Sequence, residues 1–88
     1  MEYLKIKADI SIQKINEFNQ SKLSFINGLS QIEGYSGFTE KTGQQINITI
    51  GWINRKSLDR FLETDLYRLF HGALITLSTS INIDISSD

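Results

Sequence analysis

The spacing of apolar residues switches repeatedly between a period of two and a helical period, and this alternation constrains the fold of the chain more than any other feature. Strict alternation over residues 3–10 predicts a half-buried strand. Residues 35–42 and 45–53 predict two more strands, joined by a hairpin loop at Thr42-Gly43-Gln44. Residues 81–85 predict the last strand.

Helical periodicity fills the two remaining stretches. Residues 12–29 predict a helix with Ser11 as its N-cap, and residues 54–77 predict a second helical stretch capped by Asn54. Thr64-Asp65 predicts a break and a new cap within that stretch. The resulting order, β-α-β-β-α-β, predicts an α+β, ferredoxin-like fold in which two crossovers place their helices on one face of a four-stranded antiparallel sheet. We expect a single domain spanning residues 1–88.

Composition limits the kinds of function. The chain has 40% hydrophobic and 22% charged residues, a formal net charge of -1 and no cysteine, so a disulfide or thiolate-bound metal is excluded. This charge gives no long-range attraction for nucleic acid. We expect neither a signal peptide nor a membrane span, which favours a soluble, cytoplasmic domain. Without covalent cross-links, so small a domain also favours self-association.

One ring on the helix-facing side of the predicted third strand and one on the predicted second helical stretch leave two interpretations open. Trp52 and Phe61 are able to line a pocket for a flat apolar ligand, or simply to fill the core. His71 is the one histidine, so any imidazole-based chemistry depends on it. It lies on the flank of the apolar stripe of its helix, where a partly solvated surface histidine is the alternative.

Two polar features also have alternative interpretations. Lys22 falls within the apolar stripe of the first helix, where it either faces an anionic ligand group or extends its ammonium into water. The second face of the sheet is mostly polar, which is unusual for a dimer interface. Either a sheet-to-sheet dimer has a hydrated interior, or dimerisation uses other surfaces, or the domain is monomeric.

Two segments carry a resemblance to a known family. These are E-G-Y-S-G-F (residues 33–38) and the strand and helices of residues 45–74, which include W-I-N-R-K-S-L-D-R-F-L-E-T-D-L-Y-R-L-F-H. They resemble the antibiotic-biosynthesis-monooxygenase (ABM) superfamily. That resemblance implies a dimeric α+β barrel, with a pocket in each subunit between sheet and helices. Many members oxidise polycyclic phenols or quinols with oxygen, so no cofactor is required.

The second segment looks most like the haem-degrading branch of that superfamily. His71 falls at the position of the histidine that ligates iron in that branch. Phe61 replaces the tryptophan that crowds the porphyrin, and Ala8 replaces the asparagine of the first strand, or Lys7 does if the register slips by one. One of three motif residues is retained. Haem is therefore a possible ligand or substrate, with His71 on the iron.

The sequence thus predicts a homodimeric, ABM-like monooxygenase that binds a small aromatic or tetrapyrrole ligand. His71 is the predicted catalytic base. The predicted ligand-binding residues are Trp52, Phe61, Tyr67, Lys22 and Ala8. The alternative is a non-catalytic ligand-binding or regulatory module with the same fold.

Overall fold

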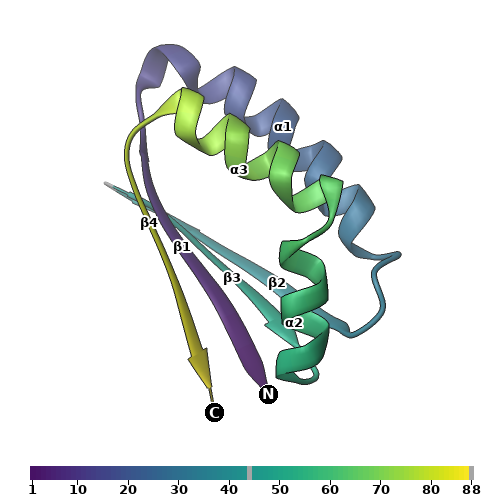
Figure 1. Cartoon of the computed structure of the whole chain (residues 1–88). Coiled ribbons are helices and arrows are strands. Elements are labelled where there is room, and N and C mark those ends of the chain that lie inside the picture. Colours follow the sequence, from purple (N-terminus) through teal and green to yellow (C-terminus); the bar gives the residue numbers. More distant parts are fainter. Residues whose placement is uncertain (44, 88) are drawn as a thin grey trace.

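A computed structural model describes residues 1–43 and 45–87 of the chain. It confirms the β-α-β-β-α-β order, with the second helical stretch divided in two (Figure 1). The elements are β1 (Glu2–Ile10), a 3₁₀ turn η1 (Ile12–Lys14), α1 (Ile15–Leu29), β2 (Tyr35–Thr42), β3 (Ile46–Trp52), α2 (Arg55–Leu62), α3 (Asp65–Leu77) and β4 (Ser78–Ser87).

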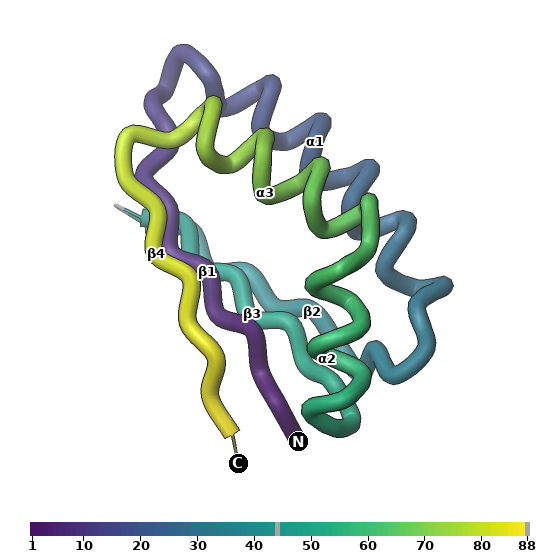
Figure 2. The backbone as a smooth tube through the Cα atoms, viewed as in Figure 1, coloured from purple at the N-terminus to yellow at the C-terminus, as the bar shows by residue number. Residues whose placement is uncertain are grey.

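The strands form one antiparallel sheet in the order β2-β3-β1-β4, which confirms the predicted fold class. All helices lie on one face of this sheet, with α1 and α3 side by side and α2 over the end of the sheet where β3 finishes (Figure 1). The two termini lie next to each other, because Glu2 pairs with Ser87 (Figure 2). Within residues 1–43 and 45–87, no helix is long and apolar enough to cross a membrane.

Side-chain caps divide the second helical stretch as predicted. The side-chain oxygen of Asn54 accepts a hydrogen bond from the Ser57 amide at 2.8 Å and starts α2. Thr64 starts α3 in the same way, since its hydroxyl accepts from the Tyr67 amide at 3.2 Å. The chain changes direction at Thr64, so α2 and α3 pack on different parts of the sheet.

Two predicted boundaries differ from the structure. Ser11 was expected to cap the first helix, but its side chain makes no capping bond. Its carbonyl instead accepts from the Lys14 amide at 2.9 Å, which closes a 3₁₀ turn ahead of α1. β4 begins at Ser78, directly after α3, whereas residues 81–85 were predicted. In the predicted hairpin loop, Gln44 lies outside the described residues, and the Gly43 amide donates to the Gln45 carbonyl at 3.1 Å.

The core lies between the sheet and the helices. It holds the helix-facing side chains of β1 and β3 together with the inner faces of all three α-helices. The ring of Phe25 on α1 stacks on Phe70 of α3, with centroids 4.0 Å apart and planes at 6°. This contact joins the two long helices into one layer. The buried set is Leu4, Ile6, Ala8, Phe18, Phe25, Leu29, Ile46, Ile48, Ile50, Trp52, Leu58, Phe61, Phe70, Leu74 and Leu77.

Gly34 is the residue that the connection from α1 to β2 requires to be glycine. Its φ of +89° is strained for any residue with a side chain, and a Cβ there would collide with the side chain of Ser57 on α2. Gly34 also accepts a hydrogen bond from the Ile53 amide at 2.9 Å. This glycine therefore fixes how α2 approaches the sheet.

We predict that Gly34→Ala lowers the free energy of unfolding by at least about 2 kcal/mol, through backbone strain and the clash with Ser57. Gly37→Ala is the matched control, because a Cβ there meets nothing within 4 Å. It should leave stability unchanged or raise it by up to about 1 kcal/mol. Urea unfolding followed by circular dichroism measures both, and equal stabilities for the two variants would contradict the prediction.

Candidate functional site

Four aromatic rings form a continuous row from the core to the surface. Trp52 at the end of β3 stacks on Phe61 of α2, with centroids 4.5 Å apart. Phe61 contacts Tyr67 of α3 at 5.3 Å, and Tyr67 stacks on His71 at 5.6 Å with planes at 7°. The structure thus brings together four of the residues that the sequence singled out. We call this set the aromatic row.

Local structure explains why these rings meet. β3 carries Trp52 on its helix-facing side, and the turn at Ile53 and Asn54 sends α2 back over that end of the sheet. The break at Thr64 then starts α3 beside Phe61. Tyr67 and His71 are four residues apart on α3, so their rings lie one above the other on the same side of the helix.

The inner end of the row carries an unpaired polar group. Both Trp52 and Phe61 are 0% exposed. The indole Nε1–H of Trp52 has no hydrogen-bond partner among the described residues. A buried donor without an acceptor costs free energy, so this N–H is available to any acceptor that reaches it.

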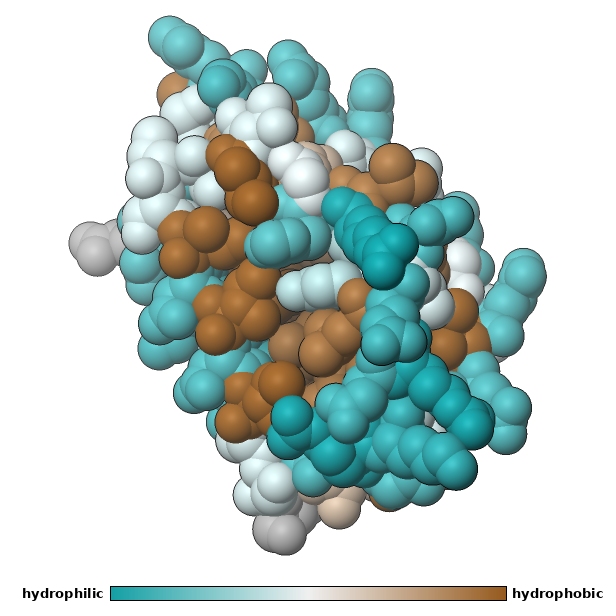
Figure 3. Space-filling model, viewed as in Figure 1, coloured by the Kyte–Doolittle hydropathy of each residue, from teal (hydrophilic) through white to brown (hydrophobic). Residues whose placement is uncertain are grey.

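The outer end of the row is partly open to solvent. Tyr67 and His71 are half-buried, in agreement with the position of His71 on the flank of its helix. The helix-facing side chains of the edge strand β4 are half-buried too, whereas Leu4, Ile6 and Ala8 of β1 and the helix-facing side chains of β3 are almost completely covered. Figure 3 shows apolar side chains exposed along this edge. The half-buried apolar side chains of β4 are Ile81, Ile83 and Ile85. Cover by the helices therefore thins out toward β4.

Lys22 lies away from the aromatic row and has a partner of its own. Its ammonium contacts both carboxylate oxygens of Glu40 on β2, at 2.7 and 2.9 Å, and lies 5.5 Å from the centroid of the Phe18 ring. The two charged side chains are 17% and 19% exposed. Glu40 pairs with Ile48 of β3. Ile48 lies four residues, or about 13 Å, along β3 from Trp52. An anionic ligand at Lys22 would have to compete with this carboxylate.

Ala8 is buried in the core near the far end of the sheet. Ala8 pairs with Ile46 of β3, whereas Trp52 pairs with Glu2 of β1. Glu2 lies six residues, or about 20 Å, along β1 from Ala8. Ala8 faces the helices, as the predicted parity requires. The structure places it at a distance from the Trp52 end of the row.

Burial changes the acidity of one member of the row. Desolvation of the Tyr67 hydroxyl raises its pKa above the ordinary value of about 10, because the phenolate is less stable away from water. Tyr67 is therefore neutral at physiological pH and able to donate a hydrogen bond. Within residues 1–43 and 45–87, no three His, Cys, Asp or Glu side chains gather as a metal site would require.

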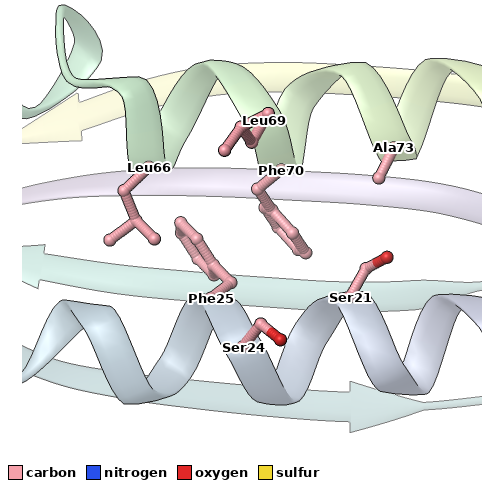
Figure 4. Close-up of a pocket in the computed structure, with 7 residues that line it drawn as sticks. All are labelled: Ser21, Ser24, Phe25, Leu66, Leu69, Phe70 and Ala73. Carbon is pink, nitrogen blue, oxygen red and sulfur yellow. The ribbon is translucent and has the colours of Figure 1, made fainter.

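Sequence reasoning missed two features. One is that Glu40 is the partner of Lys22. The position of Glu40 on the helix-facing side of β2 could have indicated this pairing. The other is a groove of about 310 Å³ between α1 and α3, with Ser21, Ser24, Leu69 and Ala73 along it and the stacked Phe25–Phe70 pair among its lining residues (Figure 4). A second hollow, of about 470 Å³, lies on the open face of the sheet and is lined by Tyr3, Lys5, Thr49, Ser86 and Ser87.

Comparisons with known proteins place the fold. No family model matches the sequence, and a search of curated proteins finds no significant match. Solved structures match over nearly the whole chain. A conserved protein from Methanosarcina mazei Go1 superposes with a TM-score of 0.90 at 17% identity, over 99% of this chain and 91% of that one.

Two further solved structures carry functional names. An antibiotic biosynthesis monooxygenase superposes with a TM-score of 0.86 at 11% identity, over 100% of this chain and 98% of that one. SnoaB, a cofactor-independent oxygenase from Streptomyces nogalater, superposes with a TM-score of 0.86 at 12% identity, over 99% of this chain and 91% of that one. The chain is thus an α+β protein of the ferredoxin-like class. More specifically, it shares its fold with these two solved structures, one named an antibiotic biosynthesis monooxygenase and the other a cofactor-independent oxygenase.

The raised pKa of Tyr67 gives a prediction for alkaline pH. As pH rises past about 10, tyrosine ionises in the unfolded chain before it does so in the folded protein, so the free energy of unfolding falls from there up to the folded-state pKa. Tyr67→Phe should reduce this alkaline loss and remove a late step from the absorbance titration at 295 nm. Chemical unfolding at pH 8, 10 and 11 measures the first effect. If the free energy of unfolding falls equally steeply with pH in both proteins, the raised pKa does not belong to Tyr67.

Proposed function

We propose that this protein binds a flat, largely apolar ligand between its sheet and helices, against the aromatic row, and oxygenates it without a resident cofactor. The observation that carries the proposal is the row itself. Its inner end holds an unpaired N–H and its outer end holds the one imidazole of the chain. Aromatic walls with a few fixed polar groups are typical of sites for planar ligands.

The buried indole supplies a reason for a ligand with an oxygen atom. The Nε1–H of Trp52 lacks an acceptor in the structure, and a phenol, phenolate or quinone oxygen is an acceptor. A ligand that inserts beside Phe61 would therefore replace an unsatisfied group with a hydrogen bond. An aromatic hydrocarbon of the same shape would gain the stacking alone.

The half-buried edge between α3 and β4 is the proposed entrance. Tyr67 and His71 lie on the helix side, and the half-buried isoleucines of β4 lie on the strand side. Entry requires side-chain rearrangement, because Trp52 and Phe61 are in contact and fully buried. Stacking on the ligand would replace the stacking between these rings.

The chemistry proposed for the site is proton removal followed by reaction with oxygen. Neutral His71 accepts a proton from the acidic C–H or O–H of the substrate, and the resulting carbanion or phenolate is electron-rich enough to reduce O₂. Conversion of a ring CH₂ to a carbonyl by O₂ releases one water, so the substrate supplies all four electrons. No external reductant is needed. The protein contributes the base, the positioning and the exclusion of water.

Two alternatives rest on features of the same row. Haem is a planar substrate for which the half-buried His71 would be the iron ligand. A non-catalytic binding module is favoured by the closed packing of Trp52 on Phe61. A Soret shift on titration with haemin that His71→Ala removes would support the first. Ligand binding without oxygen uptake would support the second.

For the oxygenase, we predict that the protein accelerates oxygen uptake by anthrone-type compounds, and that His71→Ala lowers the rate by about 100-fold or more. Gly72→Ala is the matched control, because it changes the next residue of α3 and its Cβ meets nothing within 4 Å. It should retain the rate. An oxygen electrode measures all three proteins, and uptake no faster than in buffer refutes the catalytic proposal.

A second prediction tests the indole independently of catalysis. Trp52→Phe should weaken the binding of 2-naphthol about fivefold more than it weakens the binding of naphthalene. A factor of about five in affinity corresponds to one net hydrogen bond. Isothermal titration calorimetry gives both affinities. Equal weakening for the two compounds would show that Trp52 contributes packing alone.

We also propose that two copies pair through the open face of the sheet, as in a dimeric α+β barrel. This face is polar and has the hollow beside Tyr3 and Lys5, so the interface would be hydrated. Thr49 lines that hollow and pairs with Lys5 across the strands. Thr49→Lys should dissociate this dimer, as measured by sedimentation velocity, because it adds a second cation beside Lys5 in each copy.

A further inference from the structure

The end of the sheet that α2 covers has a row of four residues with hydrogen-bonding side chains (Figure 1). Trp52 of β3 pairs with Tyr35 of β2 on one side and with Glu2 of β1 on the other. Glu2 pairs in turn with Ser87 of β4. We call these four residues the terminal row. The next helix-facing row along the sheet is apolar and consists of Phe38, Ile50, Leu4 and Ile85.

Glu2 is the carboxylate of the terminal row, and it lies on the helix-facing side of β1. It is two residues from the fully buried Leu4, so the two side chains share a face of the sheet. It is directly opposite Trp52, and the Cβ atoms of such a pair are about 5 Å apart. Glu2 also acts on Arg55 of α2, whose pKa is raised first by the hydrogen bond and charge of Asp59 and then by the charge of Glu2. The carboxylate thus lies near both the buried indole and α2.

The terminal row contains a donor and an acceptor that do not meet. The Nε1–H of Trp52 is buried and has no hydrogen-bond partner among the described residues. The half-buried Glu2 carboxylate accepts a hydrogen bond from the Ser87 hydroxyl, and a carboxylate is able to accept about four. A single group that accepts from the indole and donates to the carboxylate would satisfy both. A hydroxyl is such a group, because its oxygen accepts and its hydrogen donates.

The same two side chains discriminate between kinds of ligand oxygen. A quinone or ether oxygen accepts from the indole N–H but presents only lone pairs to the carboxylate. A phenolate adds repulsion between two negative charges. A site that contacts a hydroxyl through both its oxygen and its hydrogen rejects analogues that lack the hydrogen, since a buried polar group is then left unpaired.

We propose that Glu2 is a specificity-determining residue of the site, and that a ligand hydroxyl binds between its carboxylate and the indole N–H of Trp52. The proposal rests on the proposed function, because the ligand must bind beside Trp52. It narrows the oxygen that the site accepts to a protonated hydroxyl. A ligand held by this hydroxyl at the inner end of the aromatic row extends along the row, so His71 acts on a C–H at its other end.

Isothermal titration calorimetry with 2-naphthol and its methyl ether, 2-methoxynaphthalene, tests the proposal on the full chain. The ether keeps the rings and an acceptor oxygen but has no O–H. Glu2→Ala should reduce the preference for the naphthol over the ether about tenfold, as expected for a hydrogen bond to a charged acceptor. Glu2→Gln keeps the shape and an acceptor oxygen, so it should lose less of this preference. Glu17→Ala is the matched control, because it removes an exposed carboxylate from the first turn of α1 and should keep the wild-type preference.

The outcomes separate this inference from the proposed function. If the wild-type protein binds neither compound, the proposed function is refuted and this inference with it. If both compounds bind and Glu2→Ala leaves the preference unchanged, or Glu17→Ala lowers it equally, the role of Glu2 alone is overturned. Circular dichroism melting confirms that each variant is folded.

Discussion

Aromatic contact between the layers is the interaction on which the rest of this structure depends. Phe25 of α1 stacks face to face on Phe70 of α3 and also contacts Phe61 of α2, which in turn stacks on Trp52 of the sheet. Each of the three α-helices is thereby linked to the others or to β3 through rings that are at most 3% exposed. A chain of 88 residues without cysteine has few other means of holding a helix layer on a sheet.

The same rings that hold the core also form the proposed binding site, and this sets a limit on both roles. Trp52 and Phe61 stabilise the closed protein when they touch, and a ligand must separate them to lie between sheet and helices. Any affinity is therefore the difference between new stacking and lost stacking, plus the hydrogen bond that the indole gains. The half-buried outer end at Tyr67 and His71 is the part of the row that is easiest to move, since solvent already reaches it.

Local patterns in the sequence predicted the elements, because period and caps are properties of neighbouring residues. The caps at Asn54 and Thr64 were correct for this reason. Ser11 was wrong as a cap, because a 3₁₀ turn satisfies the backbone there. The Lys22–Glu40 pair and the groove between α1 and α3 were not predicted. Both depend on contacts between residues far apart in the sequence, such as the close approach of Gly28 to Leu66 that sets how near the two helices lie.

The inner strand β1 is hydrogen-bonded to β3 on one side and to β4 on the other. Its pairing with β4 joins the first and last described strands, from Glu2–Ser87 to Ile10–Ser78. During synthesis, the ribosome must release residues up to the eighties before β1 finds its second neighbour. Until then one edge of β1 is unpaired and open to association with other nascent chains. Such high contact order also slows folding relative to a helical bundle of equal length.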